Sequence, residues 1–205
     1  MWIEQVPNWI RCLYPKAVWW RKPQPQKTLY LTFDDGPHPD ITPWILEQLD
    51  AFNIKATFFC IGSNAEKYPK LIQEIQQRGH AIGLHGYSHV RGLYKNTEKF
   101  FADIEKGAQY IKSTLFRPPH GRITPKQAKL LGQQYTVVLW DVITRDYDAS
   151  LTPEQVEKIA LKYTRNGSIV VFHDSAKALK NMQHAFPQTV KQWQKEGYQF
   201  KRIND

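Results

Sequence analysis

The feature that most constrains the fold of this chain is a regular alternation of short β-rich runs with amphipathic helical patterns, separated by Gly, Pro and Asp. Strictly alternating strands and helices favour parallel pairing with right-handed crossovers. Two architectures have this order, an open doubly wound sheet and a barrel. The predicted strands cover residues 28–33, 56–61, 80–84, 116–117, 136–142, 169–172 and 198–200.

The segments between these runs carry apolar residues at helical spacing. In the first segment Pro43 lies in the first turn, and Ile45, Leu46 and Leu49 share one face. We expect helices at residues 42–52, 63–79, 97–115, 124–134, 152–163 and 181–196. The sequence contains no internal repeat or linker. We therefore assign residues 27–205 to one domain and residues 1–26 to an aromatic and basic strap packed across it.

Length and composition show that the core needs no external staple. The chain has 205 residues, 41% of them hydrophobic, and a formal net charge of +9. A chain of this length buries roughly 70% of the surface that its unfolded form exposes. Cys12 and Cys60 lie in unrelated contexts and are expected to be free thiols. A bound metal ion would therefore have a functional role, since the fold does not need it for stability.

The sequence shows no segment typical of export or membrane insertion. Residues 1–27 contain no signal-peptide core, and no run of about 18 apolar residues occurs anywhere. We expect no transmembrane segment and take the cytoplasm as the default location. Trp9, Trp19 and Trp20, mixed with basic residues, leave a membrane-surface association of residues 1–26 as an alternative.

Polar side chains follow the predicted strands at the ends that converge on one face of a parallel α/β fold. Asp34 and Asp35 follow the first strand, and others lie in or after later strands: His85, His89, Arg117, Asp146 and His173. We therefore expect carboxylates, imidazoles and a guanidinium group to meet at one rim.

Three of these residues form a candidate metal site. His85 and His89 are four residues apart, a spacing that lets two imidazoles share one ion. On its own, this spacing is explained equally well by two surface histidines that bind no metal. Asp35 completes three protein ligands and leaves a zinc-like ion an open position for water. The sequence predicts one divalent ion, zinc first, with cobalt, nickel and manganese also compatible.

Asp34 is a candidate general base. Because the backbone turns at Gly36 and Pro37, one of the two adjacent carboxylates can bind the ion while the other stays free. The alternative is a turn in which both carboxylates cap backbone amides. Arg117 can orient the free carboxylate by a bidentate pair, or be a solvated arginine before a proline turn.

His173 is a candidate general acid. It ends a strongly apolar strand, and with Asp146 as a carboxylate partner it is suited to give a proton to a leaving amine. The alternative is a structural histidine with satisfied hydrogen bonds.

These residues lie in five ordered segments that resemble the motifs of the polysaccharide deacetylases, the carbohydrate esterase family that shares the NodB homology domain. The resemblance covers about residues 27–200. Residues 32–36, Thr-Phe-Asp-Asp-Gly, look like the first motif, which implies Asp34 as catalytic base and Asp35 as metal ligand. Residues 85–89, His-Gly-Tyr-Ser-His, look like the second, which implies both histidines as metal ligands.

The third motif is similar to residues 117–121, Arg-Pro-Pro-His-Gly. This similarity implies that Arg117 orients the base and that a backbone amide near His120 helps to hold the oxyanion. The segment 140–147 is similar to the fourth motif, which implies Asp146 as partner of the catalytic acid and Tyr147 as a substrate contact.

The fifth motif resembles residues 171–173, Val-Phe-His, which implies His173 as the catalytic acid and Val171 as a further substrate contact. Other positions depart from the family pattern. Leu84 and Gly86 replace Asn and a Thr or Ser, which implies weaker support of the metal ligands. His120 replaces an aromatic residue, Ile143 an Asp and Tyr147 a Trp, so we expect activity with an altered substrate preference.

The resemblance implies an α/β fold, an irregular (β/α) barrel of seven or eight strands. It also implies a metal-dependent hydrolase that removes N-acetyl groups from an N-acetylglucosamine-containing glycan, of the chitooligosaccharide or peptidoglycan type. Alternatives are an O-acetyl esterase, a cyclic-amide hydrolase and an inactive glycan-binding module. The positive charge favours an anionic envelope polymer, whereas the even spread of Lys and Arg and the lack of a recognition motif argue against nucleic acid.

Overall fold

The computed structural model describes residues 4–92 and 97–205. Seven strands form one curled parallel sheet in the order β5-β4-β3-β2-β1-β7-β6. An additional strand, β8 (Gln199–Phe200), pairs with the beginning of β1. The strands of the sheet are β1 (Thr28–Asp34), β2 (Thr57–Cys60), β3 (Ala81–Leu84), β4 (Leu115–Phe116), β5 (Thr136–Val137), β6 (Val142–Ile143) and β7 (Ile169–His173).

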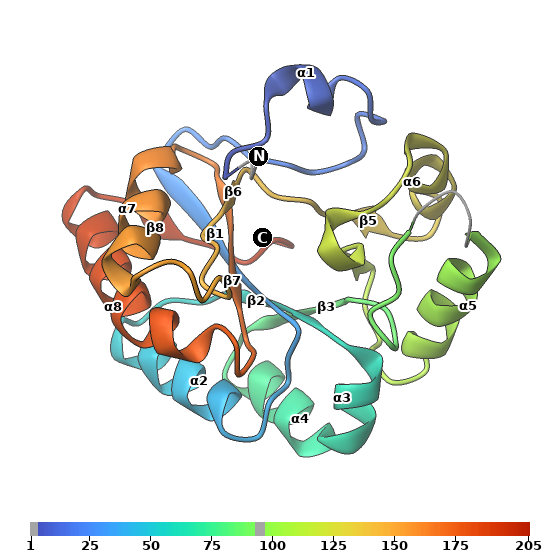
Figure 1. Ribbon diagram of the computed structural model, residues 1–205, viewed down its shortest axis with the longest axis horizontal. Coiled ribbons are helices and arrows are strands. Elements are labelled where there is room, and N and C mark those ends of the chain that lie inside the picture. The colour runs from blue at the N-terminus through green and yellow to red at the C-terminus, as the bar shows by residue number, and fades with distance from the viewer. Residues whose placement is uncertain (1–3, 93–96) are drawn as a thin grey trace.

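Helices surround the curled sheet on its outer side (Figure 1). This arrangement confirms the predicted single-domain α/β fold of the (β/α) barrel type. The helices are α1 (Asn8–Arg11), α2 (Ile41–Ala51), α3 (Gly62–Lys67), α4 (Pro69–Gln77), α5 (Thr97–Gly107), α6 (Pro125–Leu131), α7 (Pro153–Tyr163) and α8 (Leu179–Lys195), with a short 3-10 turn at Pro119–Gly121.

Strand β1 lies in the interior of the sheet, between β2 and β7, and its sequence is largely apolar. Every residue of Thr28–Asp34 is buried, as expected for a parallel strand covered on both sides. Phe33 stacks on Phe58 of β2 at a centroid distance of 5.1 Å and contacts Phe172 of β7 and Phe186 of α8. These rings join the sheet to the outer helical layer.

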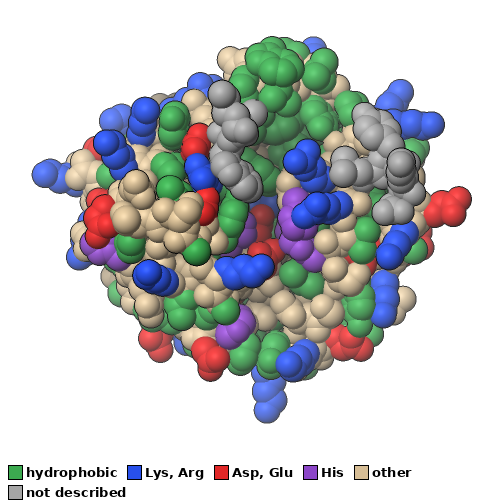
Figure 2. All heavy atoms as spheres, in the orientation of Figure 1, with side chains coloured by type: hydrophobic (Ala, Val, Ile, Leu, Met, Phe, Trp, Pro, Cys, Tyr) green, Lys and Arg blue, Asp and Glu red, His purple; other side chains and the backbone are tan. Residues whose placement is uncertain are grey.

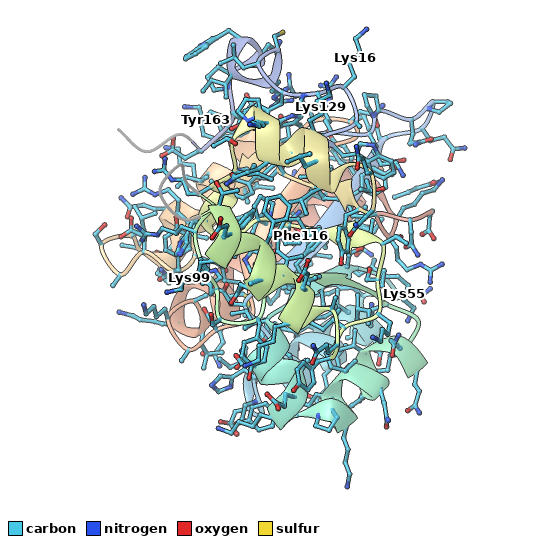
Figure 3. The ribbon with its side chains drawn as sticks, turned by 90° about the vertical axis from the view of Figure 1, so that its right-hand side faces the viewer. Lys16, Lys55, Lys99, Phe116, Lys129 and Tyr163 are labelled. Atoms are coloured by element: carbon cyan, nitrogen blue, oxygen red, sulfur yellow. The ribbon has the colours of Figure 1, made fainter. Side chains whose placement is uncertain are left out.

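The opposite flank of the sheet is packed in the same way. Phe116 of β4 is fully buried, and its ring meets the ring of Phe100 in α5 edge to face at 6.1 Å. Figure 3 shows Phe116 turned inward beneath the helices, whereas Lys99 and Lys129 lie toward the outside. The amphipathic stripe of α5 therefore covers the sheet as its spacing predicts.

Helices α6 and α7 each begin with a capping box. Thr124 and Thr152 each accept a hydrogen bond from the backbone of a glutamine three residues later, and the glutamine side chain returns to the threonine amide. Pro125 and Pro153 follow at the first helical position. These reciprocal bonds satisfy amides that a helix start leaves unpaired.

Three predicted elements are wrong in their extent. The helix expected at 63–79 is two helices, because Tyr68 is non-helical before Pro69. The helix expected at 97–115 ends at Gly107, which lets the chain become extended before it enters β4. The strand expected at 136–142 is split into β5 and β6, because its first half pairs with β4 and its second half with β7.

The segment before β1 fills the space between β5 and β6. The Trp19 amide donates a hydrogen bond to the Val137 carbonyl at 2.9 Å, and the Trp19 carbonyl accepts a hydrogen bond from the Leu139 amide at 2.7 Å. Further toward the N-terminus, Gln5 bridges Val142 of β6. Figure 1 shows this segment, with α1, across the side of the sheet where β5 and β6 lie. It therefore joins the two end strands of the sheet.

Both cysteines are free, as predicted: Cys12 is exposed and Cys60 is buried. Across residues 4–92 and 97–205, no helix has the length and apolar character needed to cross a membrane.

Candidate active site

The carboxyl ends of the strands surround a cavity of about 640 Å³. Asp34 at the end of β1 is in register with His173 at the end of β7. Figure 2 shows the hollow near the centre of the face, with acidic and histidine side chains in it and Lys and Arg around it. Seven of the predicted site residues line the cavity: Asp34, Asp35, His85, His89, His120, Tyr147 and His173.

Asp35, His85 and His89 form one cluster. Their ligand atoms lie within 4.8 Å of one another. The Oδ1 atom of Asp35 is 3.2 Å from Nε2 of His89 and 3.7 Å from Nε2 of His85. Asp35 and His89 both have positive φ, at 80° and 61°. Such backbone strain in residues other than glycine concentrates at functional sites.

The hydrogen bonding of His85 prepares its outer nitrogen for a metal ion. Its Nδ1 lies 2.8 Å from the carbonyl oxygen of Arg117, so Nδ1 carries the proton and Nε2 offers a lone pair toward Asp35. Burial lowers the pKa of His85 despite the opposing charges of Asp34 and Asp35. A neutral imidazole is the form that binds metal.

The charge of Asp35 also fits a metal site. Burial alone would raise its pKa, but the hydrogen bond with His89 and the charges of the surrounding histidines outweigh burial and hold the pKa well below its ordinary value. One carboxylate and two imidazoles are donors that suit zinc and several other divalent ions. The residues present therefore fit the predicted ion.

Asp103 of α5 holds the loop that joins the two histidines. Its carboxylate accepts hydrogen bonds from the amides of Tyr87 and Ser88, at 2.8 and 2.9 Å, and from the Ser88 hydroxyl. Gly86 has a φ of 75°, and a Cβ atom there would lie 2.6 Å from Oδ2 of Asp103. The glycine at this departure from the family pattern thus makes room for Asp103.

Asp34 is paired with a buried guanidinium. Nη1 of Arg117 donates to Oδ1 of Asp34 at 2.6 Å and to the Thr32 hydroxyl at 2.8 Å. Arg117 is fully buried and directs its other nitrogens to the carbonyls of Val138 and Leu139. The predicted bidentate pair is therefore wrong in geometry: a single nitrogen contacts Asp34, because the others satisfy backbone carbonyls.

His173 is paired with a buried carboxylate on the other side of the cavity. Its Nδ1 lies 2.7 Å from Oδ1 of Asp146, whose Oδ2 accepts the His173 amide at 2.7 Å. Burial lowers the pKa of His173, but the charge and hydrogen bond of Asp146 dominate and raise it to about 9. With Nδ1 bound to Asp146, Nε2 remains available toward the cavity.

The predicted substrate contacts divide into two groups. The rings of Tyr147 and His120 lie against His173 and His89, with centroids 4.7 and 4.3 Å apart. Burial, together with His89 and Arg91, lowers the pKa of His120 to about 4. Val171, by contrast, is fully buried within β7 and does not line the cavity.

Several cavity features were not found from the sequence. Trp140 and Ile143 form apolar wall, and Arg91, Arg122 and Lys177 also line the cavity. Asp103 was missed because an isolated acid in a helical pattern carries no sign of its partner. The only sequence signal for it is its position beside the apolar stripe of α5, which predicts a buried carboxylate.

Comparisons with known proteins identify relatives of the chain. The family model described as polysaccharide deacetylase matches residues 21–137. The chain is 32% identical over 196 residues to a peptidoglycan-N-acetylglucosamine deacetylase of Bacillus cereus, covering 92% of each protein. It is 33% identical over 159 residues to a chitooligosaccharide deacetylase of Azorhizobium caulinodans, covering 74% of this chain and 75% of that protein.

Solved structures show the same fold. The Bc1960 peptidoglycan N-acetylglucosamine deacetylase superposes with a TM-score of 0.85 at 30% identity, covering 96% of this chain and 94% of that one. A pseudoenzyme from Bacillus anthracis has a TM-score of 0.82 at 21% identity, covering 93% and 68%. Some relatives are longer: the chain spans 55% of a second Bacillus cereus deacetylase and 40% of one from Listeria monocytogenes.

Proposed function

The chain belongs to the polysaccharide deacetylase family, and from this premise we propose that it hydrolyses the N-acetyl groups of an N-acetylglucosamine-containing glycan. The observation that carries the proposal is the meeting of two buried acid–base pairs with three candidate metal ligands around one cavity. Asp34 is paired with Arg117, and His173 with Asp146. A structural polar network would not need both pairs to open onto the same cavity.

In this proposal Asp34 is the base. A divalent ion held by Asp35, His85 and His89 would supply Lewis acidity at the acetyl carbonyl and at a water molecule. Asp34 takes a proton from a water molecule while the oxygen of that water bonds to the carbonyl carbon. Arg117 fixes the direction of the Asp34 carboxylate, because its guanidinium is itself held by three other oxygen atoms.

His173 is the acid in the second step. The carbon–nitrogen bond breaks, the amine nitrogen takes a proton from Nε2 of His173, and acetate leaves with the oxygen that came from water. Asp146 stabilises the protonated imidazole and orients it. A backbone amide near His120 is proposed to stabilise the oxyanion.

Trp140, Tyr147 and Ile143 support a sugar substrate, since they give the cavity the apolar and aromatic wall on which a pyranose ring packs. We propose zinc as the ion, with cobalt, nickel or manganese as substitutes. The test below also distinguishes the alternative functions: an O-acetyl esterase, a cyclic-amide hydrolase and an inactive glycan-binding module.

The test is acetate release from N-acetylglucosamine oligomers and peptidoglycan fragments by protein stripped of metal and reloaded with zinc or cobalt. Acetylated xylan serves as the O-acetyl arm. We expect metal-dependent release from the amino sugars. Asp34→Asn should lower kcat by about 100-fold or more while the bound metal, measured by elemental analysis, stays constant.

Asp40→Asn is the matched control, because Asp40 is exposed and its side chain makes no capping hydrogen bond. It should leave acetate release unchanged. Normal turnover by Asp34→Asn would exclude Asp34 as the base. No release by metal-loaded protein from any amino sugar would refute the deacetylase proposal.

A further inference from the structure

We propose that Arg91, Arg122 and Lys177 form a subsite for an anionic oxygen group, a carboxylate or a phosphate, carried by the glycan. The proposal concerns the same cavity and rests on the proposed function. It states what kind of glycan the site selects: a charged amino sugar in preference to a neutral one.

The fold places the three cations on two walls of the cavity. Arg122 follows the turn after β4, and Arg91 lies in the segment after β3. The amide of Gly92 donates to the Arg122 carbonyl at 3.0 Å, which holds the two arginine backbones together. A Cβ atom on Gly92 would lie 2.5 Å from that oxygen, so glycine permits this approach. Lys177 follows β7, which β1, β2 and β3 separate from β4.

Arg91 and Arg122 have no acidic partner among the residues that the structure describes. Of nine arginines in the sequence, Arg21, Arg91 and Arg122 form no ion pair in the described parts of the chain, and two of these three line the cavity. The other arginines are each within 4.0 Å of a carboxylate: Arg11, Arg78, Arg117, Arg145, Arg165 and Arg202.

The acids of the cavity are already engaged. Among the described residues, Asp34 and Asp35 are the carboxylates that line it. Asp34 is bound by Arg117, and Asp35 belongs to the candidate metal cluster. The positive charge at Arg91, Arg122 and Lys177 is therefore left for a ligand, and a concave wall strengthens its field.

The chemistry of the side chains defines the ligand. Two guanidinium groups that line one cavity suit a planar or tetrahedral oxyanion, which accepts paired N–H donors, and lysine adds a point charge. The Trp140 ring in the same cavity suits the sugar that carries the anion. A neutral oligomer would leave these cations hydrated and gain nothing from them.

The test measures binding by calorimetry in the Asp34→Asn background, in which turnover is not expected to consume the ligand. The ligands are a disaccharide of N-acetylglucosamine and N-acetylmuramic acid, the same disaccharide with its carboxyl group reduced to an alcohol, and N,N′-diacetylchitobiose with and without a 6-phosphate. We expect at least one anionic sugar to bind about tenfold more tightly than its neutral counterpart, the gain typical of a charge-assisted hydrogen bond.

Arg91→Gln with Arg122→Gln should reduce that preference to less than about twofold. Lys158→Gln with Lys162→Gln removes the same charge from exposed positions of α7 and should keep the preference. A preference for the carboxylate or for the phosphate identifies the source of the anion.

Equal affinity for charged and neutral sugars overturns the subsite, as does a preference that survives in the arginine variant. Binding is measured in Asp34→Asn and acetate release in the metal-loaded parent, so the two proposals can fail separately. A preference for the anionic sugar without acetate release by the parent supports the subsite and refutes the proposed function. Acetate release by the parent without a preference for the anionic sugar supports the proposed function and refutes the subsite.

Discussion

Two carboxylates beneath the same cavity receive different cationic partners, and this difference separates their chemistry. Asp34 contacts a guanidinium, which cannot give up its proton, so Asp34 faces water as a base. Asp146 contacts an imidazole, which can give up its proton, so the His173–Asp146 pair presents a proton at the opposite side of the cavity. The two partners thus assign proton removal to Asp34 and proton donation to His173.

The pairing of His173 predicts the alkaline limit of activity. Because Asp146 raises the His173 pKa to about 9, acetate release should fall as pH rises through that value and His173 loses its proton. Asp34 and Asp35 contribute to the raised pKa, and a bound cation would offset their part, so the limit of metal-loaded protein lies at or below about 9. Asp146→Asn should shift this limit to lower pH. The measurement is kcat/KM across pH 5–10; an unchanged alkaline limit would contradict the role of Asp146.

The same pair affects stability with a defined sign. A raised pKa in the folded state means that the pair stabilises fully below the ordinary histidine pKa, near 6.5, and loses this contribution as pH rises through about 9. The free energy of unfolding of the parent should therefore fall relative to that of Asp146→Asn between these values.

Arg117 predicts a large stability effect at a single position. Arg117→Met would leave the Asp34 charge buried without its partner, so we expect a loss of about 3–5 kcal/mol in the free energy of unfolding. Adding Asp34→Asn should recover part of this loss, because the uncompensated charge is then gone. Urea unfolding at pH 7 measures both. Arg122→Met at the exposed wall is the control and should change stability by no more than about 0.5 kcal/mol.

At the scale of elements, helix α5 acts on the candidate metal ligands through Asp103. The three hydrogen bonds to residues 87 and 88 fix the backbone between His85 and His89. Asp103→Asn keeps the size of the side chain but cannot accept all three, so we expect zinc affinity to fall by about 10- to 100-fold. Competition with a chromogenic chelator gives the affinity without relying on turnover.

Glu105→Gln on the exposed face of α5 is the matched control for that change. It removes one carboxylate from the same helix without touching the loop, and zinc affinity should stay at the parent value. Equal affinity of Asp103→Asn and the parent would show that the loop holds its shape without Asp103.

How far the elements could be predicted depends on whether their causes are local. The predicted strand at 28–33 and the predicted starts of α6 and α7 were correct, because apolar runs and residues that start helices act over a few positions. The run at 136–142 was misjudged because its two ends pair with different strands, β4 and β7, and because Trp19, far away in sequence, bonds to the backbone of Val137 and Leu139.

The candidate site divides in the same way. Residues expected at strand ends do meet around the cavity, since parallel strands end at one rim. The hydrogen bonds of Asp103 and the joining of Arg91 to Arg122 arise between segments distant in sequence, so no spacing revealed them. The roles assigned to the site residues, the metal and the cytoplasmic location stay predictions.

At the scale of the whole molecule, the segment before β1 completes the sheet. Trp19 bonds beside β5, Gln5 bridges β6, and Arg11 contacts the buried Asp141 between them. Removal of residues 1–20 should expose the end strands and leave Asp141 with fewer donors, lowering the midpoint of thermal unfolding by several degrees. Scanning calorimetry measures the midpoint. An unchanged midpoint would show that the segment only rests on a sheet that is stable without it.

The position of β1 between β2 and β7 has a consequence for synthesis on the ribosome. β2 follows β1 closely, whereas β7 begins at residue 169, so at 5–20 residues per second one edge of β1 waits roughly 7–27 s for its neighbour. During that interval a strand that is fully buried in the folded protein presents open hydrogen-bonding groups, which is the form of chain that aggregates or engages holdase chaperones. The strand that carries the proposed base at its end is therefore also the one whose nascent form most needs protection.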